Sequence, residues 1–203
     1  MTTIYLIRHS KTGKDSFISR FYKPLNKNVR FSLGEEGRKI AEKKLSNKIL
    51  NDVTKIYSSN YKRAYQTSLF LAKRLNLKVI KDKRFGERIH GIKKSYSELP
   101  ENFEILQFND ETFKMPSGES QNMVRKRMLD GLYDILNNNE DNTIAIFTHS
   151  TAMIFLLKHW CESEDFKLKF NNKIIFDGKV DYVECYKLEF DKNKLINIEN
   201  IKL

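Results

Sequence analysis

The 203-residue chain is poor in cysteine and has no long apolar run, and both absences narrow its class. Its two cysteines, Cys161 and Cys185, form neither a disulfide framework nor the spacing of a metal site. No apolar stretch approaches the roughly 20 residues that cross a bilayer. The first residues lack the basic, apolar and small-residue order of a secretory signal. These absences predict a protein of the reducing cytoplasm with no membrane partner.

Internal repeats, low-complexity segments and linkers are also missing, so we expect residues 1–203 to form a single domain. A hydrophobic content of 40% and a charged content of 31% are typical of a globular protein. A chain of this length can bury a sizeable core.

Positive charge is plentiful, since the formal net charge is +11 at neutral pH. Such an excess can indicate a nucleic-acid partner. The lysines are scattered, however, and no basic run is interleaved with aromatic side chains that stack on bases. We therefore expect no nucleic-acid partner, and we interpret the charge as a field that attracts small phosphorylated substrates.

Hydrophobic periodicity predicts strands that alternate with helices. The expected strands are 4–7, 53–57, 77–80 and 143–147, and the expected helices are 33–50, 61–75, 120–137 and 151–160. Two further alternating segments, 183–190 and 195–201, flank a polar turn and predict a terminal hairpin. The pattern favours the α/β class: a three-layer α/β/α sandwich around a mainly parallel, mixed sheet with a C-terminal β-hairpin.

Two segments are expected to be irregular. A polar loop follows the first strand to about residue 28, and a longer stretch, 84–117, is punctuated by glycine and proline. Long irregular segments inside compact domains are often binding loops, so we expect a substrate-capping loop at about 92–117. Its aromatic side chains either line a leaving-group pocket or hold the loop together; they are Tyr96, Phe103, Phe108 and Phe113.

Two of the four histidines, His9 and His149, come directly after predicted strands, and each is followed by serine. Ligands of open α/β sheets bind beyond the carboxyl ends of the strands. Imidazoles also titrate near neutral pH, which suits them to proton transfer and nucleophilic attack. We therefore expect His9 and His149 to share one active site.

Three more polar side chains are expected at the same edge: Arg8, Arg63 and Glu87. Arginine donates pairs of hydrogen bonds to phosphoryl oxygens, and a carboxyl group can protonate a leaving oxygen. Helix N-termini expected after Ser10, Asn60 and Ser150 would add backbone amides. Together with the two histidines, these groups predict a phosphoryl-transfer site.

Five motifs, in the same order, resemble those of the histidine phosphatase superfamily, whose fold is phosphoglycerate mutase-like. The resemblance covers about residues 1–160 and rests on 6–12, 57–67, 87–91, 148–150 and Gly118-Glu119-Ser120 with Arg127. Four positions depart from the family pattern, and two of them, Gly34 and Ile40, belong only to a peripheral helix start. Ser10 stands where glycine is usual, and Lys11 stands where an acidic or amide residue is usual. None of the four removes a catalytic group.

The resemblance implies a role for each motif residue. His9 would be the nucleophile and form a transient phosphohistidine. Arg8, Arg63 and His149 would hold the phosphoryl oxygens, where charge develops in the transition state. Glu87 would protonate the leaving oxygen and then activate water. Ser10, Thr12 and Ser150 are expected to donate hydrogen bonds to phosphate. Arg127 is expected to be structural and to hold the Glu119 loop by charge pairing. Neither a cofactor nor a metal is implied.

We therefore expect a metal-independent phosphomonoester hydrolase of the short phosphatase branch, acting on a small phosphorylated metabolite. A cofactor-dependent phosphoglycerate mutase is the alternative within the family, and a non-catalytic protein that binds a phosphate ligand is the alternative of another class. The sequence leaves open the leaving group and whether the terminal strands pair in a homodimer. It also leaves open other candidate acids, namely Glu98, Glu101, Glu104, Glu111 and Glu119.

Overall fold

The computed structural model describes residues 1–13, 30–92 and 96–203. Most of the polar loop expected to end near residue 28 therefore lies outside the described residues. The same is true of residues 93–95 in the expected capping loop, so the following account concerns the rest of that loop.

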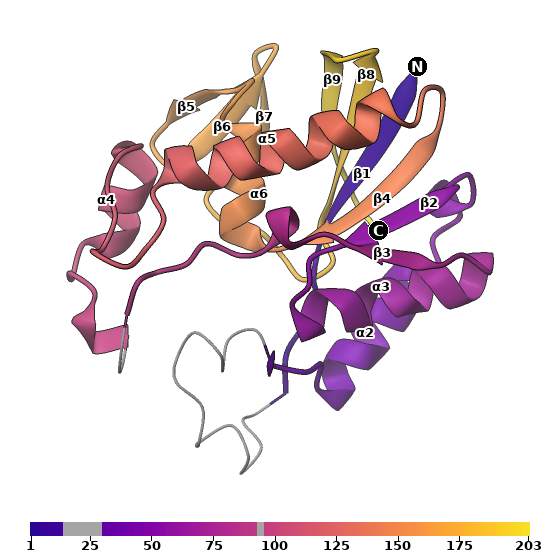
Figure 1. Ribbon diagram of the computed structural model, residues 1–203, viewed down its shortest axis with the longest axis horizontal. Helices are drawn as coiled ribbons and strands as arrows, with labels where there is room; N and C mark the ends of the chain where they lie inside the picture. The colour runs from indigo at the N-terminus through magenta and orange to yellow at the C-terminus, as the bar shows by residue number, and fades with distance from the viewer. Residues whose placement is uncertain (14–29, 93–95) are drawn as a thin grey trace.

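A six-stranded sheet forms the centre of the molecule, in the order β3-β2-β4-β1-β8-β9 (Figure 1). Strands β3, β2, β4 and β1 run parallel, whereas β8 is antiparallel to both β1 and β9. The predicted mixed sheet and C-terminal hairpin are thus confirmed. The strand bounds are β1 Thr2–Arg8, β2 Lys55–Ser58, β3 Val79–Lys81, β4 Thr143–Thr148, β8 Cys185–Asp191 and β9 Lys194–Ile201.

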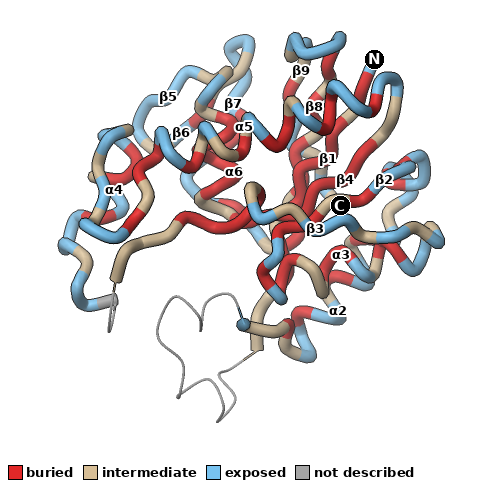
Figure 2. Tube along the Cα trace, viewed as in Figure 1, coloured by how far each residue is buried: buried red, intermediate tan, exposed pale blue. Residues whose placement is uncertain are grey.

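Helices cover both faces of this sheet because its central strands are apolar on both sides. Successive residues of β1 alternate between two buried clusters: Ile4 and Leu6 face one, and Tyr5 and Ile7 face the other. The buried residues lie along the strands and on the helix faces that turn towards the sheet (Figure 2). Residues of α5 and α6 belong to the first cluster, and residues of α2 and α3 belong to the second. The helix bounds are α2 Glu35–Leu45, α3 Lys62–Leu75, α5 Gln121–Asn137 and α6 Ser150–Leu157.

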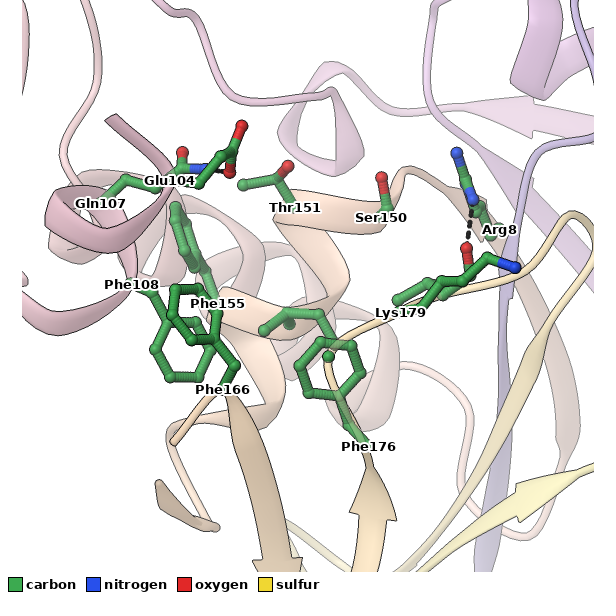
Figure 3. A pocket seen from close by; sticks show the side chains of 13 residues that line it. Arg8, Glu104, Gln107, Phe108, Ser150, Thr151, Phe155, Phe166, Phe176 and Lys179 are labelled. Atoms are coloured by element: carbon green, nitrogen blue, oxygen red, sulfur yellow. Dashed lines mark hydrogen bonds between the residues drawn. The ribbon is translucent and has the colours of Figure 1, made fainter. Parts of the chain in front are cut away.

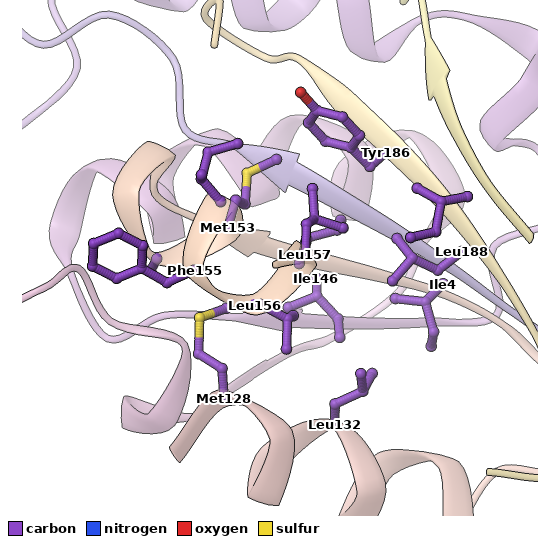
Figure 4. Close-up of a cluster of buried hydrophobic side chains, with 14 of the residues drawn as sticks. Ile4, Met128, Leu132, Ile146, Met153, Phe155, Leu156, Leu157, Tyr186 and Leu188 are labelled. Atoms are coloured by element: carbon purple, nitrogen blue, oxygen red, sulfur yellow. The ribbon is translucent and has the colours of Figure 1, made fainter. Parts of the chain in front are cut away.

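Helix α6 is apolar on nearly every side because it is enclosed. Six consecutive residues, from Ala152 to Leu157, are buried. Met153, Leu156 and Leu157 lie with Ile146 of β4 and Met128 of α5 in the first cluster (Figure 4). A helix that is hydrophobic all round belongs inside a protein. No helix in the described part of the chain is long and apolar enough to cross a membrane.

The helix expected over 33–50 is shorter than the sequence suggests. Helix α2 ends at Leu45, and a separate 3-10 turn, η2 (Lys48–Leu50), follows it. The Asn47 side chain accepts a hydrogen bond from the Ile49 amide at 3.0 Å and so begins the new turn. Asparagine offers the backbone this local alternative to a continued helix.

The stretch 84–117 is less irregular than expected. It contains α4 (Phe103–Asn109) and the 3-10 turn η4 (Tyr96–Glu98), and η3 (Lys83–Phe85) overlaps its start. Phe103 and Phe108 of α4 are buried. This short helix is therefore stabilised by packing rather than by a long periodic pattern, which is why the sequence did not reveal it.

A second, three-stranded sheet was not predicted at all. It consists of β5 (Glu162–Glu164), β6 (Lys167–Phe170) and β7 (Lys173–Phe176) in sequence order. Every residue of β5 is exposed, and this strand carries no apolar alternation, so it offers no strand signal. This small sheet and α4 lie on the same side of the molecule in Figure 1, where they flank α6.

Candidate active site

The carboxyl ends of the three central strands meet at one edge of the sheet. Arg8 of β1 pairs with Thr148 of β4, and Ser58 of β2 pairs with Phe147 of β4. The bonding continues one residue further: the His9 amide donates to the Thr148 carbonyl at 2.9 Å. This register brings together the residues that follow the strands, as the parallel topology predicts.

His9 is held in one tautomer by two hydrogen bonds. Its Nε2 lies 2.9 Å from Nε of Arg63, and its Nδ1 lies 2.7 Å from the carbonyl oxygen of Ser10. Because an arginine nitrogen only donates, Nε2 must be the acceptor. The proton therefore belongs on Nδ1, which donates to Ser10. The lone pair of His9 is on Nε2, the atom beside Arg63.

His149 lies beside His9, with their ring centroids 5.0 Å apart. Its Nε2 is 2.8 Å from the Ser59 hydroxyl oxygen, and that oxygen also accepts the Tyr61 amide at 3.1 Å. The Tyr61 ring meets the His149 ring edge-on at a centroid distance of 4.7 Å. The other nitrogen, Nδ1, is buried without a hydrogen-bond partner among the described residues.

Burial and nearby positive charge keep both imidazoles neutral. Desolvation lowers the pKa of His9 well below its usual value, and the charges of Arg63 and Arg8 lower it further. The pKa of His149 is lowered in the same way, by burial first and then by Arg63. Both rings are therefore uncharged at neutral pH, and Nε2 of His9, which accepts the hydrogen bond from Arg63, carries no proton.

Arg8 extends from the end of β1 into a partly buried position. One terminal nitrogen donates to the Val180 carbonyl, and the guanidinium carbon lies 4.7 Å from the centre of the Tyr182 ring. Its Nε is buried without a partner among the described residues. Buried polar atoms are rarely left unpaired. Arg8 Nε and His149 Nδ1 are thus two buried atoms at this edge whose hydrogen-bonding capacity is unused among the described residues.

Glu87 lies at the N-terminal end of α6. Its carboxylate oxygen Oε1 accepts the amides of Arg88 at 2.9 Å and Ala152 at 3.1 Å. The side chain is buried, with the residue only 8% exposed. Glu87 is thus fixed close to Ser150 and Thr151 in the first turn of the same helix.

Arg127 has the structural role expected for it. Its guanidinium makes a two-point ion pair with Glu119, at 2.8 and 3.0 Å, and one nitrogen also donates to the carbonyls of Arg84 and Gly86. A paired fork of this kind fixes orientation as well as charge. A second nitrogen donates to the carbonyl of Glu87 itself at 3.2 Å, so Arg127 holds the backbone that leads up to and includes Glu87.

Arg88 is a supporting residue that the sequence did not reveal. It is only 1% exposed, and its guanidinium donates to the Glu119 and Phe113 carbonyls and to the Gln107 side chain. These bonds tie the Glu87 segment to α4 and the loop after it. Arginine is ordinarily a solvated residue, and no spacing rule marks this one as buried.

The three hydroxyl residues expected near phosphate occupy different positions. The Ser10 hydroxyl donates to the Gly37 carbonyl at 2.7 Å, and its amide donates to the Thr67 hydroxyl at 3.0 Å. Both donors of Ser10 are thus used within the protein, and a contact with phosphate would require one bond to break. Thr12 is partly buried and forms an isolated β-bridge with Leu33. No helix follows Ser10 directly, since residues 11–13 are non-helical.

Ser150 starts α6 and lines a cavity of about 370 Å³ that opens beside the site (Figure 3). Arg8, Ser150 and Thr151 form its polar end. Its far wall is aromatic: Phe108 from α4, Phe155 from α6, and Phe166 and Phe176 from the small sheet. Part of the expected capping loop therefore does line a pocket, together with residues 166–180, for which no such role was expected.

The assembled groups are two arginines, two neutral histidines and one carboxylate on a helix N-terminus. Such a set can attack a phosphorus atom, bind its oxygens and transfer a proton. Across residues 1–13, 30–92 and 96–203, no three His, Cys, Asp or Glu side chains are grouped so that they could hold a metal ion.

Comparison with known proteins points to one family. A family model described as histidine phosphatase superfamily (branch 1) matches residues 4–196. Among characterised proteins, phosphoserine phosphatase 1 from Hydrogenobacter thermophilus is 26% identical over 159 residues, which cover 75% of this chain and 73% of that protein.

Solved structures show the same architecture. A mycobacterial glucosyl-3-phosphoglycerate phosphatase in complex with inorganic phosphate superposes with a TM-score of 0.72 at 17% identity, covering 98% of this chain and 95% of that one. Bacillus stearothermophilus YhfR superposes with a TM-score of 0.72 at 21% identity, covering 97% and 95%. At such identities the similarity establishes a shared fold, which is the predicted one.

Proposed function

Because the chain belongs to the histidine phosphatase superfamily, branch 1, we propose that it hydrolyses phosphomonoesters through a phosphohistidine formed on His9. The observation that carries the proposal is the tautomer of His9. Arg63 and the Ser10 carbonyl leave the lone pair on Nε2, and burial keeps that nitrogen unprotonated. A neutral imidazole nitrogen beside a guanidinium is suited to attack a bound phosphoryl group.

In the first half-reaction, Nε2 of His9 forms a bond to phosphorus as the bond to the ester oxygen breaks. The Arg63 N–H that now donates to His9 donates to a phosphoryl oxygen instead. Arg8 and His149 Nδ1, each with an unpartnered buried nitrogen, donate to the other oxygens. Protonated Glu87 gives its proton to the leaving oxygen, and the alcohol departs.

In the second half-reaction, water attacks the phosphohistidine. The Glu87 carboxylate takes one proton from the water as its oxygen bonds to phosphorus, and the P–N bond to His9 breaks. Inorganic phosphate is released, and His9 regains its lone pair. The two arginines supply positive charge at the phosphoryl oxygens, which supports a reaction that needs no metal ion.

The names of the similar proteins support small phosphorylated metabolites as the substrates of this chain. The Hydrogenobacter protein is named for phosphoserine, and the mycobacterial structure for glucosyl-3-phosphoglycerate.

Both cysteines are free thiols, which supports the reducing cytoplasmic compartment that we propose.

The decisive experiment compares the wild type with His9→Ala in excess EDTA. We expect phosphate release from phosphomonoesters in the wild type and a loss of at least about a thousandfold in the variant, since nucleophile removal has effects of that order or larger. Rapid quenching under alkaline conditions should trap a phosphoryl group on His9 of the wild type. His159→Ala is the matched control, because His159 is exposed just past the C-terminal end of α6 and the variant should retain full activity.

Each other outcome points elsewhere. Release that persists in His9→Ala would contradict the phosphohistidine, and release abolished by EDTA would contradict metal independence. Exchange between 3- and 2-phosphoglycerate without phosphate release would identify a mutase. Phosphate-ester binding without any turnover would identify the non-catalytic binding protein.

A further inference from the structure

The small sheet contains two turns of the same kind with very different residues. Each turn links neighbouring strands through two residues that both have positive φ. The β6–β7 turn uses Asn171 and Asn172, at φ 48° and 61°. The β5–β6 turn uses Asp165 and Phe166, at φ 45° and 58°. Asparagine and aspartate tolerate this region, whereas a bulky side chain there is a genuine outlier.

The position of Phe166 explains why phenylalanine stands in that strained turn. Its ring stacks on Phe108 of α4 at a centroid distance of 4.7 Å and an interplanar angle of 23°. The two rings line the cavity that opens beside the phosphoryl site, as Figure 3 shows. Backbone strain persists where the surroundings enforce it, and it concentrates at ligand-binding positions.

Phe108 is itself fixed. The Lys158 ammonium lies 4.3 Å from the centre of its ring and donates to its backbone carbonyl at 2.6 Å. Phe108 is only 6% exposed and belongs to the main core cluster. Phe166 is partly exposed and comes from a separate hairpin. The Phe108 ring is thus held rigidly by the core, and the small sheet places the Phe166 ring against it.

Further apolar residues continue the aromatic wall of the cavity, and two charged side chains that line it, Lys179 and Glu104, have partners within the protein. Phe155, Phe176 and Val180 continue the wall. Lys179 pairs with Asp181 at 2.8 Å and is largely exposed, and Glu104 accepts a hydrogen bond from the Gln107 side chain. The phenylalanine rings at the far end of the pocket favour an apolar group there, away from the polar end formed by Arg8, Ser150 and Thr151.

The polar end of the cavity adjoins the residues of the proposed reaction. Arg8 and Ser150 line it, and Glu87 is bonded to the Ala152 amide in the same turn of α6 that contributes Ser150 and Thr151. A phosphoryl group held by Arg8 would therefore direct its ester oxygen towards Glu87 and its organic part into the cavity. About 370 Å³ lies near the small end of ligand pockets, which suits one or two rings.

We propose that Phe166 and Phe108 form an aromatic clamp that selects phosphomonoesters with an apolar, ring-sized leaving group over those with a charged one. The inference rests on the proposed phosphatase activity. It adds a substrate class, represented by aryl phosphates, and assigns Phe166 as a specificity-determining residue.

The test compares kcat/KM for 1-naphthyl phosphate with kcat/KM for O-phosphoserine and 3-phosphoglycerate. We expect the wild type to prefer 1-naphthyl phosphate by at least about tenfold, on the scale of one desolvated ring contact. In Phe166→Asn that ratio should fall about tenfold, because the ring is lost while the turn receives a residue suited to positive φ. The melting temperature should be retained or rise.

Asn172→Gly is the matched control, since it alters the equivalent exposed turn of the same sheet, and it should leave the ratio unchanged. A second measurement needs no variant: 1-naphthol should inhibit the wild type competitively, and serine should not. A wild type that prefers phosphoserine, or a Phe166→Asn variant whose kcat/KM falls equally for all substrates, would overturn the clamp. Absence of turnover with every ester would instead contradict the proposed function.

Discussion

At the scale of single residues, the site depends on which side-chain atoms are already bonded and which are not. Three buried side-chain atoms among the described residues lack a hydrogen-bond partner, and two of them, Arg8 Nε and His149 Nδ1, lie at the carboxyl edge of the sheet. His9, in contrast, has a partner on each ring nitrogen. In the function that we propose, His9 is thus oriented before a ligand arrives, and Arg8 Nε and His149 Nδ1 remain as donors for the phosphoryl oxygens, which is the preorganisation that phosphoryl transfer needs.

Arg88 gives the first prediction at this scale, as a positioning residue that acts through Glu87. Arg88→Met removes a buried guanidinium and leaves the oxygens of Glu119, Phe113 and Gln107 without their donor. We expect a loss of at least about 3 kcal/mol in the free energy of unfolding, since three bonds from a charged donor are lost and each contributes about 1.5–3 kcal/mol. Urea denaturation measures this loss.

The same variant should change kcat more than KM, because Glu87 would no longer be held at the N-terminus of α6. Arg88→Lys, which keeps the charge but not the three-way fork, should recover part of the stability and part of kcat. Lys126→Met on the exposed face of α5 is the control for loss of a positive charge. An Arg88→Met variant with wild-type stability and kcat would show that the hydrogen bonds of the Arg88 guanidinium do not position Glu87.

At the scale of elements, the start of α2 is pressed against the loop that follows His9. A Cβ atom added at Gly37 would lie 1.9 Å from the Lys11 carbonyl oxygen, so only glycine allows this approach. The Gly37 carbonyl in turn accepts the Ser10 hydroxyl. Helix α2 therefore supports the loop that carries His9 through backbone contacts. Ser10, which stands where the family usually has glycine, contributes its hydroxyl to that contact.

Gly37→Ala tests this contact. Alanine favours a helix over glycine by about 1 kcal/mol, yet we expect a net destabilisation of about 1–3 kcal/mol, because the helix or the loop must shift to remove the clash. Phosphatase activity should fall with stability, since the Ser10 loop carries His9. Lys39→Ala on the exposed face of α2 is the control and should be close to neutral. A Gly37→Ala protein more stable than the wild type would refute the close approach.

At the scale of the whole molecule, the buried histidines make stability depend on pH. In the unfolded chain a histidine titrates near its ordinary pKa of about 6.5. In the folded protein the pKa values of His9 and His149 lie well below this, because of burial and the arginine charges. Below about pH 6.5 the unfolded state therefore binds more protons than the native state, so the free energy of unfolding falls as the pH falls.

The expected slope is up to about 1.4 kcal/mol per pH unit for each of these two histidines, over the window below about pH 6.5. Above that pH both imidazoles are neutral in both states and contribute no slope. Burial also lowers the pKa of His90, which adds in the same direction. Carboxylates with lowered pKa values, such as Asp82, lose their contribution only at lower pH.

Thermal or urea unfolding between pH 7 and pH 5 measures this slope. His149→Gln should make it shallower, whereas His159→Gln, at an exposed position, should change it much less. Equal slopes in the wild type and His149→Gln would contradict the neutral, buried state of His149.

The class of fold and the meeting of His9 with His149 follow from the amino-acid sequence alone. Apolar strands alternating with amphipathic helices allow few arrangements other than a parallel sheet covered on both faces. Residues that directly follow such strands must meet at one edge, so the pattern of strands and helices is enough to place His9 and His149 together. The shared register of β1, β2 and β4 is the physical reason that this inference holds.

The surroundings of that centre, in contrast, depend on tertiary packing. The burial of Arg88, the inward bonds of Ser10 and the small sheet with Phe166 rest on contacts between segments far apart in the chain. Short elements such as α4 and β5 have little intrinsic stability and depend on tertiary contacts: α4 buries Phe103 and Phe108, and β5 pairs with β6. Local patterns cannot report such contacts, so the leaving-group pocket is visible only in three dimensions.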